Sequence, residues 1–305
     1  MGERGAGQRL DNFLARILGD VPRSHIFRVI RKGEVRVNGK RAKPETRLQA
    51  SDTVRVPPVR TGAAAPPRRA SSTMIDSVTA AIIHEDAQLL VIDKPAGLAV
   101  HGGSGVSFGV IEALRTARPN ETLELVHRLD RDTSGLLLIS RKPAALRTLH
   151  ALMREGQVEK KYLALLKGKW ELGAKRIDVP LRTDIRVSGE RTVKAHASGK
   201  EAVSHFKPVQ FFSKKASLVE VALETGRTHQ IRVHAAYAGC PLAGDEKYGD
   251  AEFNEKMKAV GLTRMFLHAH HVSFVWPESG VEFSVSAPLP ADLAAVVDSL
   301  ADRRR

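Results

Sequence analysis

The sequence predicts an α+β protein in which a small basic module precedes a larger domain built around a mixed, mainly antiparallel sheet. Three observations support this fold class. The 305 residues are too many for one small module. Strand-like and helix-like segments are interspersed without regular βαβ alternation. Positive charge is concentrated at the front, because residues 1–70 hold 16 Lys and Arg against 6 Asp and Glu and so supply +10 of the net charge of +14.

Residues 1–57 predict a module of two helices and a small hairpin sheet. Apolar residues recur at helical spacing through "RLDNFLARIL", and Ile17 and Leu18 continue that apolar face. A second helix is predicted over "VPRSHIFRVIRKG", with Gly33 as its end. Alternating valines around the Asn38-Gly39 turn of "EVRVNGKRA" predict a hairpin, and "DTVRVP" predicts a further strand.

Basic side chains occupy the positions of this module that its apolar residues leave open. A basic patch on a compact module is typical of a polyanion-binding protein, because each phosphate contact releases condensed counterions. A merely solubilising face is the alternative. The candidate contacts in this module are Arg23, Arg28, Arg31, Lys32, Arg36 and Lys40.

The remainder of the chain predicts a linker followed by one large domain. A stretch rich in Pro, Ala, Arg and Ser predicts a flexible linker over residues 58–78. Residues 79–300 form the large domain, where "AAIIHEDAQLLVIDKP" predicts two strands around an acidic turn. "SFGVIEALRTARP" and "PAALRTLHALMREG" predict helices, and "GRTHQIRVHAAYAG" predicts a helix with or without a preceding strand. Further strands are predicted over "EKKYLALLKG", "SLVEVALETG", "MFLHAHHVSFVWP" and "VEFSVSAPLP".

Composition argues against several classes of protein. No apolar run is long enough to cross a bilayer, and the N-terminal residues contain no secretory core. The single cysteine, Cys240, cannot form an internal disulfide, and no Cys-x-x-Cys pair is present to hold zinc. These features predict a cytoplasmic protein without a membrane partner.

The segment "LVHRLDRDTSGLLLIS" places two acids, Asp130 and Asp132, in a basic loop next to an apolar run. It lacks the asparagine that a kinase catalytic loop requires. A glycosidase would use two carboxylates, but a second acid in such a loop is more often the structural partner of a neighbouring arginine. Asp130 would be a nucleophile only if it stays ionised while partly desolvated, which an adjacent guanidinium favours. An ordinary surface ion pair is the alternative for this residue.

Two other segments are weaker candidates for a site. In a strand, His268 and His270 of "HAHH" would share one face while His271 points to the other, and no Cys or carboxylate pair completes a metal shell nearby. Ordinary strand histidines are therefore favoured over a metal site. "HGGSGVSFG" has neither the G-x-G-x-x-G spacing nor a Walker lysine, so a nucleotide site is disfavoured.

Three longer motifs carry a specific family resemblance. "HRLDRDTSGLLLIS", "EKKYLALLKG" and "ETGRTHQIRVHAAYAGCPLAGDEKYG" resemble, in order and spacing, the core motifs of the ribosomal large-subunit RNA pseudouridine synthases. The front module resembles the S-four-type RNA-binding domain, named after a small-subunit ribosomal protein. "RKGEVRVNGKRAKPETRL", "VPPVR" and "AVHGGSGVSFGVIEALR" look closest to the C-type branch of that family. The resemblance covers nearly the whole chain apart from the linker and the extreme C-terminus.

The resemblance implies a role for each matching residue. Asp130 matches the essential nucleophile, and Arg232 matches the arginine that pairs with it. Tyr162 matches the tyrosine that stacks on uracil and is implicated in removing the proton from carbon 5. Arg128 matches the arginine that enters the RNA helix where the nucleotide has left it. The other residues expected to contact RNA in this domain are His127, Arg227 and His229.

The activity that the resemblance implies is isomerisation of specific uridines of 23S ribosomal RNA to pseudouridine. Reaching the glycosidic bond of a stacked uridine requires base flipping. No cofactor or metal is implied, and the protein is expected to act as a monomer. The alternatives are a pseudouridine synthase acting on small-subunit ribosomal RNA or transfer RNA, and a non-enzymatic RNA binder in ribosome assembly. The first chemical step stays open between attack on ribose, attack on the base and removal of a sugar proton.

Overall fold

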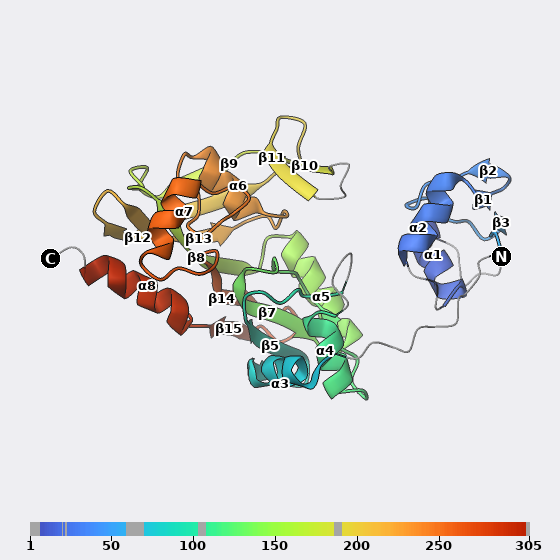
Figure 1. Cartoon of the computed structure of the whole chain (residues 1–305). Coiled ribbons are helices and arrows are strands. Elements are labelled where there is room, and N and C mark those ends of the chain that lie inside the picture. The colour runs from blue at the N-terminus through green and yellow to red at the C-terminus, as the bar shows by residue number, and fades with distance from the viewer. Residues whose placement is uncertain are drawn as a thin grey trace. The chain divides into compact units, whose positions relative to one another are not determined.

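The computed structural model describes residues 7–19, 21, 23–58, 70–102, 108–185 and 191–302. The chain divides into two compact units, residues 1–68 and residues 69–305 (Figure 1). Each unit has its own buried core, and each is described by itself.

The N-terminal unit packs two helices on a three-stranded antiparallel sheet of order β2-β1-β3. Its elements are α1 (Leu10–Ile17), α2 (Arg23–Lys32), β1 (Arg36–Val37), β2 (Lys40–Arg41) and β3 (Val54–Arg55). The predicted helices and hairpin are therefore confirmed. Ile17 differs from the expectation, since it ends α1 and is 48% exposed instead of packing with Leu10 and Leu14.

The linker predicted over residues 58–78 is wrong at its C-terminal end. Residues 59–69 lie outside the described part of the chain, but α3 (Ser72–Ala80) begins within the predicted segment. The Ser71 side chain caps this helix by accepting a hydrogen bond from the Met74 amide, and Val78 is fully buried in the core of the second unit. Ala- and Ser-rich composition concealed a helix whose stability comes from packing.

A ten-stranded mixed sheet organises the second unit, as predicted. Its main path runs β4-β5-β7-β14-β8-β13-β12-β9, with β15 paired to β14 and β6 paired to β7. Among the strand pairings of the described residues in this sheet, only that of β14 with β7 is parallel. The strands are β4 (Ile82–Glu85), β5 (Leu89–Lys94), β6 (Glu124–Leu125), β7 (Ser134–Ser140), β8 (Glu159–Lys167), β9 (Lys175–Asp178), β12 (Val203–Phe212), β13 (Ala216–Leu223), β14 (Leu267–Val275) and β15 (Glu282–Ser286).

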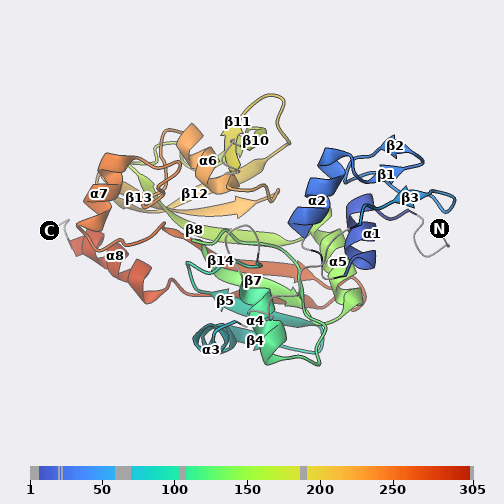
Figure 2. The same cartoon turned by 45° about the vertical axis from the view of Figure 1, so that its right-hand side comes forward.

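Helices cover both faces of this sheet (Figures 1 and 2). The helices other than α3 are α4 (Val110–Ala117), α5 (Pro143–Arg154), α6 (Gln230–Tyr237), α7 (Ala251–Lys258) and α8 (Ala291–Asp302). One core joins α3, α4 and α6 to one face of the sheet. In two further clusters, α5 packs near β5, β7 and β14, while α7 and α8 pack near β8, β12 and β13. Among the described residues, no helix is long and apolar enough to cross a membrane.

A separate two-stranded hairpin, β10 (Leu181–Ile185) and β11 (Arg191–Ala195), lies outside the main sheet. The second unit contains several elements that the sequence patterns did not predict. They are β9 to β12 and helices α3, α7 and α8.

Gly135 lets β7 and β14 approach each other immediately after the loop that carries Asp130. Its φ of +108° is one that other residues rarely adopt. A Cβ atom at this position would overlap the carbonyl oxygen of Ala269 on β14. The glycine of the Thr-Ser-Gly that closes the acidic motif is therefore a requirement of strand packing.

The three histidines of β14 do not alternate as expected. His268 pairs with Leu163 and His271 pairs with Lys161, two residues along β8, so both lie on the same face of the sheet. A bulge between Ala269 and His271 resets the alternation, and the prediction that His271 points to the opposite face is wrong.

Candidate active site

The loop between β6 and β7 carries Asp130 and is held in place by hydrogen bonds that its backbone accepts. The carbonyl of Arg131 accepts hydrogen bonds from the Gly97 amide (2.8 Å) and from Lys94 Nζ (3.0 Å). Lys94 is fully buried, and its Nζ also donates to the carbonyls of Pro95 and Leu98, both at 2.9 Å. Burial lowers the pKa of Lys94 to about 8. Lys94 thus connects the end of β5 to the loop of the acidic motif.

Arg232 projects from the first turn of α6 and grips a carboxylate that sequence analysis did not assign. Its Nε donates to Asp245 Oδ2 (2.7 Å) and its Nη2 donates to Asp245 Oδ1 (2.8 Å). The Lys247 and Tyr248 amides also donate to Asp245 Oδ1, at 2.9 and 3.0 Å. Burial by itself would raise the pKa of Asp245, but these donors outweigh it, so the pKa lies below its usual range.

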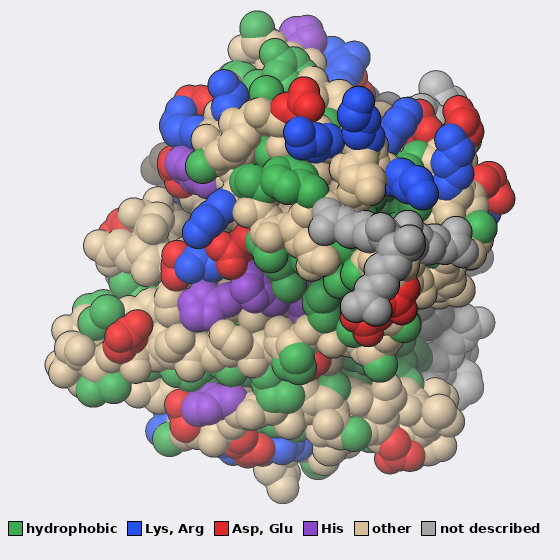
Figure 3. Space-filling model, turned by 90° about the vertical axis from the view of Figure 1, so that its left-hand side faces the viewer, with side chains coloured by type: hydrophobic (Ala, Val, Ile, Leu, Met, Phe, Trp, Pro, Cys, Tyr) green, Lys and Arg blue, Asp and Glu red, His purple; other side chains and the backbone are tan. Residues whose placement is uncertain are grey.

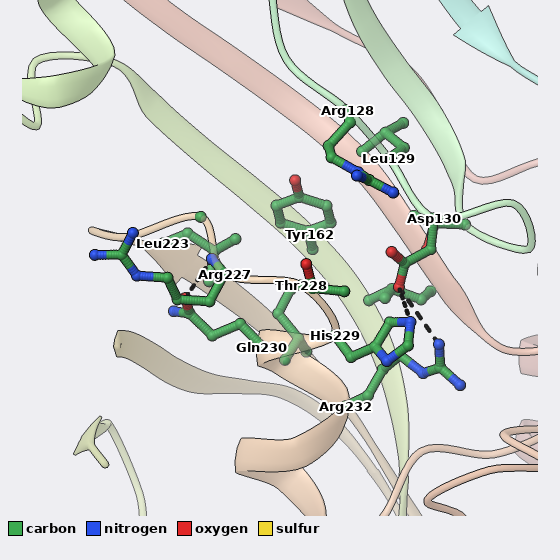
Figure 4. A pocket seen from close by; sticks show the side chains of 14 residues that line it. Arg128, Leu129, Asp130, Tyr162, Leu223, Arg227, Thr228, His229, Gln230 and Arg232 are labelled. Carbon is green, nitrogen blue, oxygen red and sulfur yellow. Dashed lines mark hydrogen bonds and ion pairs between the residues drawn. The ribbon is translucent and has the colours of Figure 1, made fainter. Parts of the chain in front are cut away.

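Asp130 meets the remaining donor of the same guanidinium. Arg232 Nη1 lies 3.4 Å from Asp130 Oδ2, which is long for a charged hydrogen bond. His229 Nε2 lies 3.8 Å from the same oxygen. The predicted pairing of Arg232 with Asp130 therefore exists, although Asp245 is the stronger partner. Figure 4 shows both contacts ending on one carboxylate oxygen, while the other points into the hollow.

The other acid of the motif has a separate partner. Asp132 Oδ1 accepts a hydrogen bond from Arg131 Nε at 3.1 Å, and both side chains are about half exposed. Arg131 is therefore the partner of Asp132, and the geometry supports the interpretation of the second acid as the structural partner of a neighbouring arginine.

His229 precedes α6 in a left-handed backbone conformation, with φ of +54°. Its Nδ1 lies 2.8 Å from the hydroxyl of Tyr248, and that hydroxyl accepts a hydrogen bond from the Val193 amide of β11. The Tyr248 ring also lies under the Arg232 guanidinium, 5.0 Å from ring centre to Cζ. Burial lowers the pKa of His229 and outweighs the opposing effect of Asp130, which favours the neutral ring.

Gln230 fastens the segment in front of α6. Its Oε1 accepts from Thr225 Oγ1 (2.7 Å) and from the Arg227 amide (2.9 Å). Its Nε2 donates to the Val203 carbonyl and to Ser204 Oγ of β12, both at 2.9 Å. All its hydrogen-bonding capacity is therefore spent on holding residues 225–227 against the sheet.

A hollow of about 80 Å³ opens beside Asp130, with Tyr162 of β8 as one wall (Figure 4). Tyr162 is only 8% exposed, and burial followed by the charge of Asp130 raises the pKa of its hydroxyl above the usual value. The phenol is therefore neutral at physiological pH. Apolar side chains complete the wall around it, namely those of Leu129, Leu223, Ile231 and Leu267.

The remaining residues predicted to contact RNA surround this hollow in different ways. Arg128 is exposed at its mouth. Arg227 lines the hollow, but its guanidinium points away from Asp130 and its Nε donates to the Glu201 carbonyl (2.8 Å). His127 faces inward, where its Nε2 accepts a hydrogen bond from the Leu138 amide (3.1 Å) and burial lowers its pKa to about 3. A neutral His127 that supports β7 is the role that these contacts favour.

The basic residues predicted in the N-terminal unit lie on α2 and the hairpin. Arg28, Arg31, Lys32 and Lys40 are exposed, and Arg36 is half-buried. Arg23 begins α2, but its side chain lies outside the described residues. No described carboxylate lies within 4.0 Å of Arg28, Arg31 or Lys40, while Lys32 Nζ is 4.0 Å from Glu34. The exposed face of α2 is therefore cationic.

The histidines of β14 contact protein side chains. His270 Nε2 lies 3.2 Å from Glu220, and His271 Nδ1 lies 2.9 Å from Ser286 Oγ. On the face in Figure 3, Lys and Arg side chains gather over the upper part and histidine side chains form a band below them. Within the described ranges, no group of three or more His, Cys, Asp or Glu side chains is arranged to hold a metal ion.

Comparison with known proteins identifies the family. Residues 88–237 match the model of the RNA pseudouridylate synthases, and residues 8–54 match the S4 domain. A ribosomal large subunit pseudouridine synthase C of Pasteurella multocida is 49% identical over 99% of this chain and 93% of its own. The chain belongs to the RNA pseudouridylate synthase family. The protein of the same name from Escherichia coli is 48% identical over 98% of this chain and 95% of its own.

A solved structure agrees with this family. Human RNA pseudouridylate synthase domain containing 4 has a TM-score of 0.62 and 25% identity, covering 75% of this chain and 96% of its own. The two family-model matches confirm the α+β fold, the S4-type module and the pseudouridine synthase family that were expected from the sequence. The chain is an isomerase of this family.

Sequence reasoning missed four residues that support the site of this pseudouridine synthase. Asp245 and Tyr248 lie in "GDEKYG", where the motif was recognised but no role was assigned to either. Gln230 lies in "GRTHQIR" between His229 and Arg232, which were both predicted as site residues. Lys94 ends β5, where Asp93 separates it from the apolar run Leu89–Ile92, and a lysine so near four buried apolar residues was the available signal for a buried cation.

Proposed function

We propose that this pseudouridine synthase converts uridines of large-subunit (23S) ribosomal RNA to pseudouridine, with Asp130 as the nucleophile. The observation that carries the proposal is the carboxylate of Asp130, which is 20% exposed, lies beside Arg232 and faces a hollow walled by Tyr162. The near full-length similarity to two ribosomal large subunit pseudouridine synthases supports this choice of RNA.

The reaction breaks the bond between ribose carbon 1′ and uracil nitrogen 1 and forms a bond from carbon 1′ to carbon 5. Carbon 5 loses its proton and nitrogen 1 gains one, so no oxidant, reductant or outside group is required. Asp130 assists the cleavage as an anion, and the guanidinium of Arg232 places a positive charge 3.4 Å from its carboxylate. Arg232 is in turn held in position by Asp245.

Tyr162 and Arg128 act on the nucleotide before and during the reaction. The Tyr162 ring offers an aromatic face for the extruded uracil, and such stacking contributes roughly 1–3 kcal/mol per base. Its raised pKa keeps the phenol protonated, which favours stacking over proton removal. Arg128 is exposed at the mouth, from where it enters the RNA helix and occupies the space that the uridine has left.

The N-terminal unit provides sequence-independent affinity for the same RNA through its exposed arginines and lysines. We place this activity in the cytoplasm, where ribosomal RNA of bacteria is made, and we propose that the enzyme acts as a monomer. A mass measurement by light scattering tests the monomer.

The decisive experiment maps pseudouridines in the RNA of the host with the gene intact, deleted and restored. Loss of one or more pseudouridines from 23S RNA, recovered by the wild-type gene and not by Asp130→Asn, is the expected result. If pseudouridines were lost only from small-subunit ribosomal RNA or transfer RNA, that RNA would be the substrate of the enzyme. If the Asp130→Asn gene also restored the pseudouridines, the remaining hypothesis would be a non-enzymatic RNA binder in ribosome assembly.

A further inference from the structure

A second hollow, of about 510 Å³, adjoins the one beside Asp130. The two hollows share five lining residues, which are Arg128, Tyr162, Leu223, Gly226 and Arg227. Beyond this common wall, the second hollow is lined by His150 and Arg154 of α5 and by Lys160 of β8. We call it the basic hollow, defined by Arg128, His150, Arg154, Lys160 and Arg227.

The charges in the basic hollow are not balanced. Arg128, Arg154, Lys160 and Arg227 line it, and none of these four has a carboxylate within 4.0 Å among the residues that the structure describes. Glu224 is the single acid in the wall. Its carboxylate is already engaged by His205 Nε2 and by Arg176 Nε, the latter at 3.6 Å.

Lys160 is the cation placed deepest beside the catalytic hollow. It lies two residues before Tyr162 on β8, so the pleat directs both side chains to the same side of the strand. Its Nζ lies 4.0 Å from the position that a Cβ on Gly226 would occupy, at the shared wall. It is half-buried, and burial lowers its pKa. An ammonium held in this way without a counterion is costly, and an anionic ligand would relieve that cost.

We propose that the basic hollow binds a backbone phosphate next to the extruded uridine, with Lys160 as the main cation and Arg154 at its rim. This subsite rests on the proposed function. An extruded nucleotide stays bonded to its neighbours through two phosphates, so at least one must lie close to the hollow that receives the base. The basic hollow, sharing a wall with that hollow, is the adjacent cationic space.

The test uses Lys160→Met, which removes the charge and keeps most of the apolar volume. Arg147→Gln is the matched control, because Arg147 is exposed on the same helix as Arg154, two turns away, and does not line the hollow. Binding is measured in an Asp130→Asn background with a synthetic RNA stem-loop around a uridine that the wild-type enzyme converts. Each RNA carries a neutral methylphosphonate at one of the two phosphates that flank this uridine.

Lys160→Met is expected to weaken binding of the unmodified RNA roughly tenfold and to reduce the slope of log K against log salt by about one. At one of the two positions, the methylphosphonate should weaken RNA binding by the parent protein. It should have little further effect on RNA binding by Lys160→Met, because the ammonium that would contact this phosphate is already absent. Lys160→Arg should restore the slope. In the active background, Lys160→Met should raise KM more than it lowers kcat, and Arg147→Gln should leave both close to the wild-type values.

An unchanged salt slope in Lys160→Met, or equal losses for parent and variant at both methylphosphonates, would overturn the subsite. If Lys160→Met does not fold, Arg154→Gln provides the same slope test, since Arg154 is exposed and its replacement cannot empty the core. These binding measurements do not depend on turnover. A failure of the proposed function would appear instead as conversion of uridine by Asp130→Asn or as no conversion by the wild type.

Discussion

Arg232 is held by Asp245 through two hydrogen bonds of 2.7 and 2.8 Å, and only its remaining nitrogen reaches Asp130, at 3.4 Å. The Asp245 side chain is 1% exposed and the Arg232 side chain is 12% exposed, so this ion pair is buried. The carboxylate of Asp245 thus orients the guanidinium so that its Nη1 faces Asp130.

We expect Asp245→Asn to destabilise the catalytic unit by about 3–5 kcal/mol, because it leaves a buried guanidinium without its charged partner. It should also lower kcat, since Arg232 is then no longer held in the orientation that presents its Nη1 to Asp130. Urea unfolding and single-turnover rates measure the two effects. The control is Glu252→Gln, which breaks the exposed Lys256–Glu252 pair of α7 and should cost no more than about 1 kcal/mol. Equal losses in both variants would remove the special role of Asp245.

Gly135→Ala should disrupt the contact between β7 and β14 and displace the loop of Asp130. The added Cβ would overlap the Ala269 carbonyl, in addition to the strain of a positive φ. Gly156→Ala separates these two causes, because Gly156 has φ of +73° but open space around it. We expect Gly156→Ala to cost about 1–2 kcal/mol and Gly135→Ala clearly more, by thermal and urea unfolding. Similar losses of stability in the two variants would show that the positive φ alone, without the overlap with the Ala269 carbonyl, accounts for the destabilisation.

His127 predicts a particular pH dependence of stability. Its pKa is about 3 in the folded protein, against about 6.5 for a free histidine. As the pH falls from 6.5, the unfolded chain takes up a proton that the folded chain refuses, and stability is lost down to about pH 3. His127→Gln keeps a possible acceptor for the Leu138 amide and removes the titration. Between pH 6.5 and 5, the wild type should therefore lose about 2 kcal/mol more than the variant. The prediction would be contradicted if the urea midpoints of the wild type and of His127→Gln changed by the same amount between the two pH values.

Neutralising α2 tests the N-terminal unit as an RNA-binding element. Replacing Arg28, Arg31 and Lys32 by Gln should reduce the salt slope of RNA binding by about two, at roughly 0.7–0.9 per phosphate contact. The control replaces Lys256 and Lys258 of α7 by Gln, since both already pair with glutamates. A triple variant with the slope of this control would assign the cationic face of α2 to solubility.

Elements with a strong apolar pattern were predictable, and those whose stability comes from packing were not. The helices of the N-terminal unit and strands β5, β8, β13 and β14 show apolar spacing or apolar runs that indicate their type. The hairpin of β10 and β11 is rich in polar residues and lies outside the main sheet. Helix α7 is mostly polar, although Asp250 caps it by accepting from the Phe253 amide.

The site was predictable only in part for a related reason. Asp130, Tyr162 and Arg232 belong to motifs that a family resemblance can assign. Asp245 has no pattern of its own, and Lys94 has only its place at the end of an apolar strand, so the importance of both depends on burial that only the folded chain creates. The bulge of β14 is a similar case, because strict alternation places His271 on the wrong face and the sequence contains no sign of the extra residue.

The side chain of Gln230 ties the wall between the two hollows to the same β12 strand against which α6 begins. Arg232 starts only two residues later, on that helix. The partition that separates an incoming base from its sugar-phosphate chain is therefore continuous with the arginine that faces Asp130. An RNA that fits this partition poorly would therefore also displace Arg232 relative to Asp130. The choice of RNA and the rate of the reaction would then depend on the same structural element.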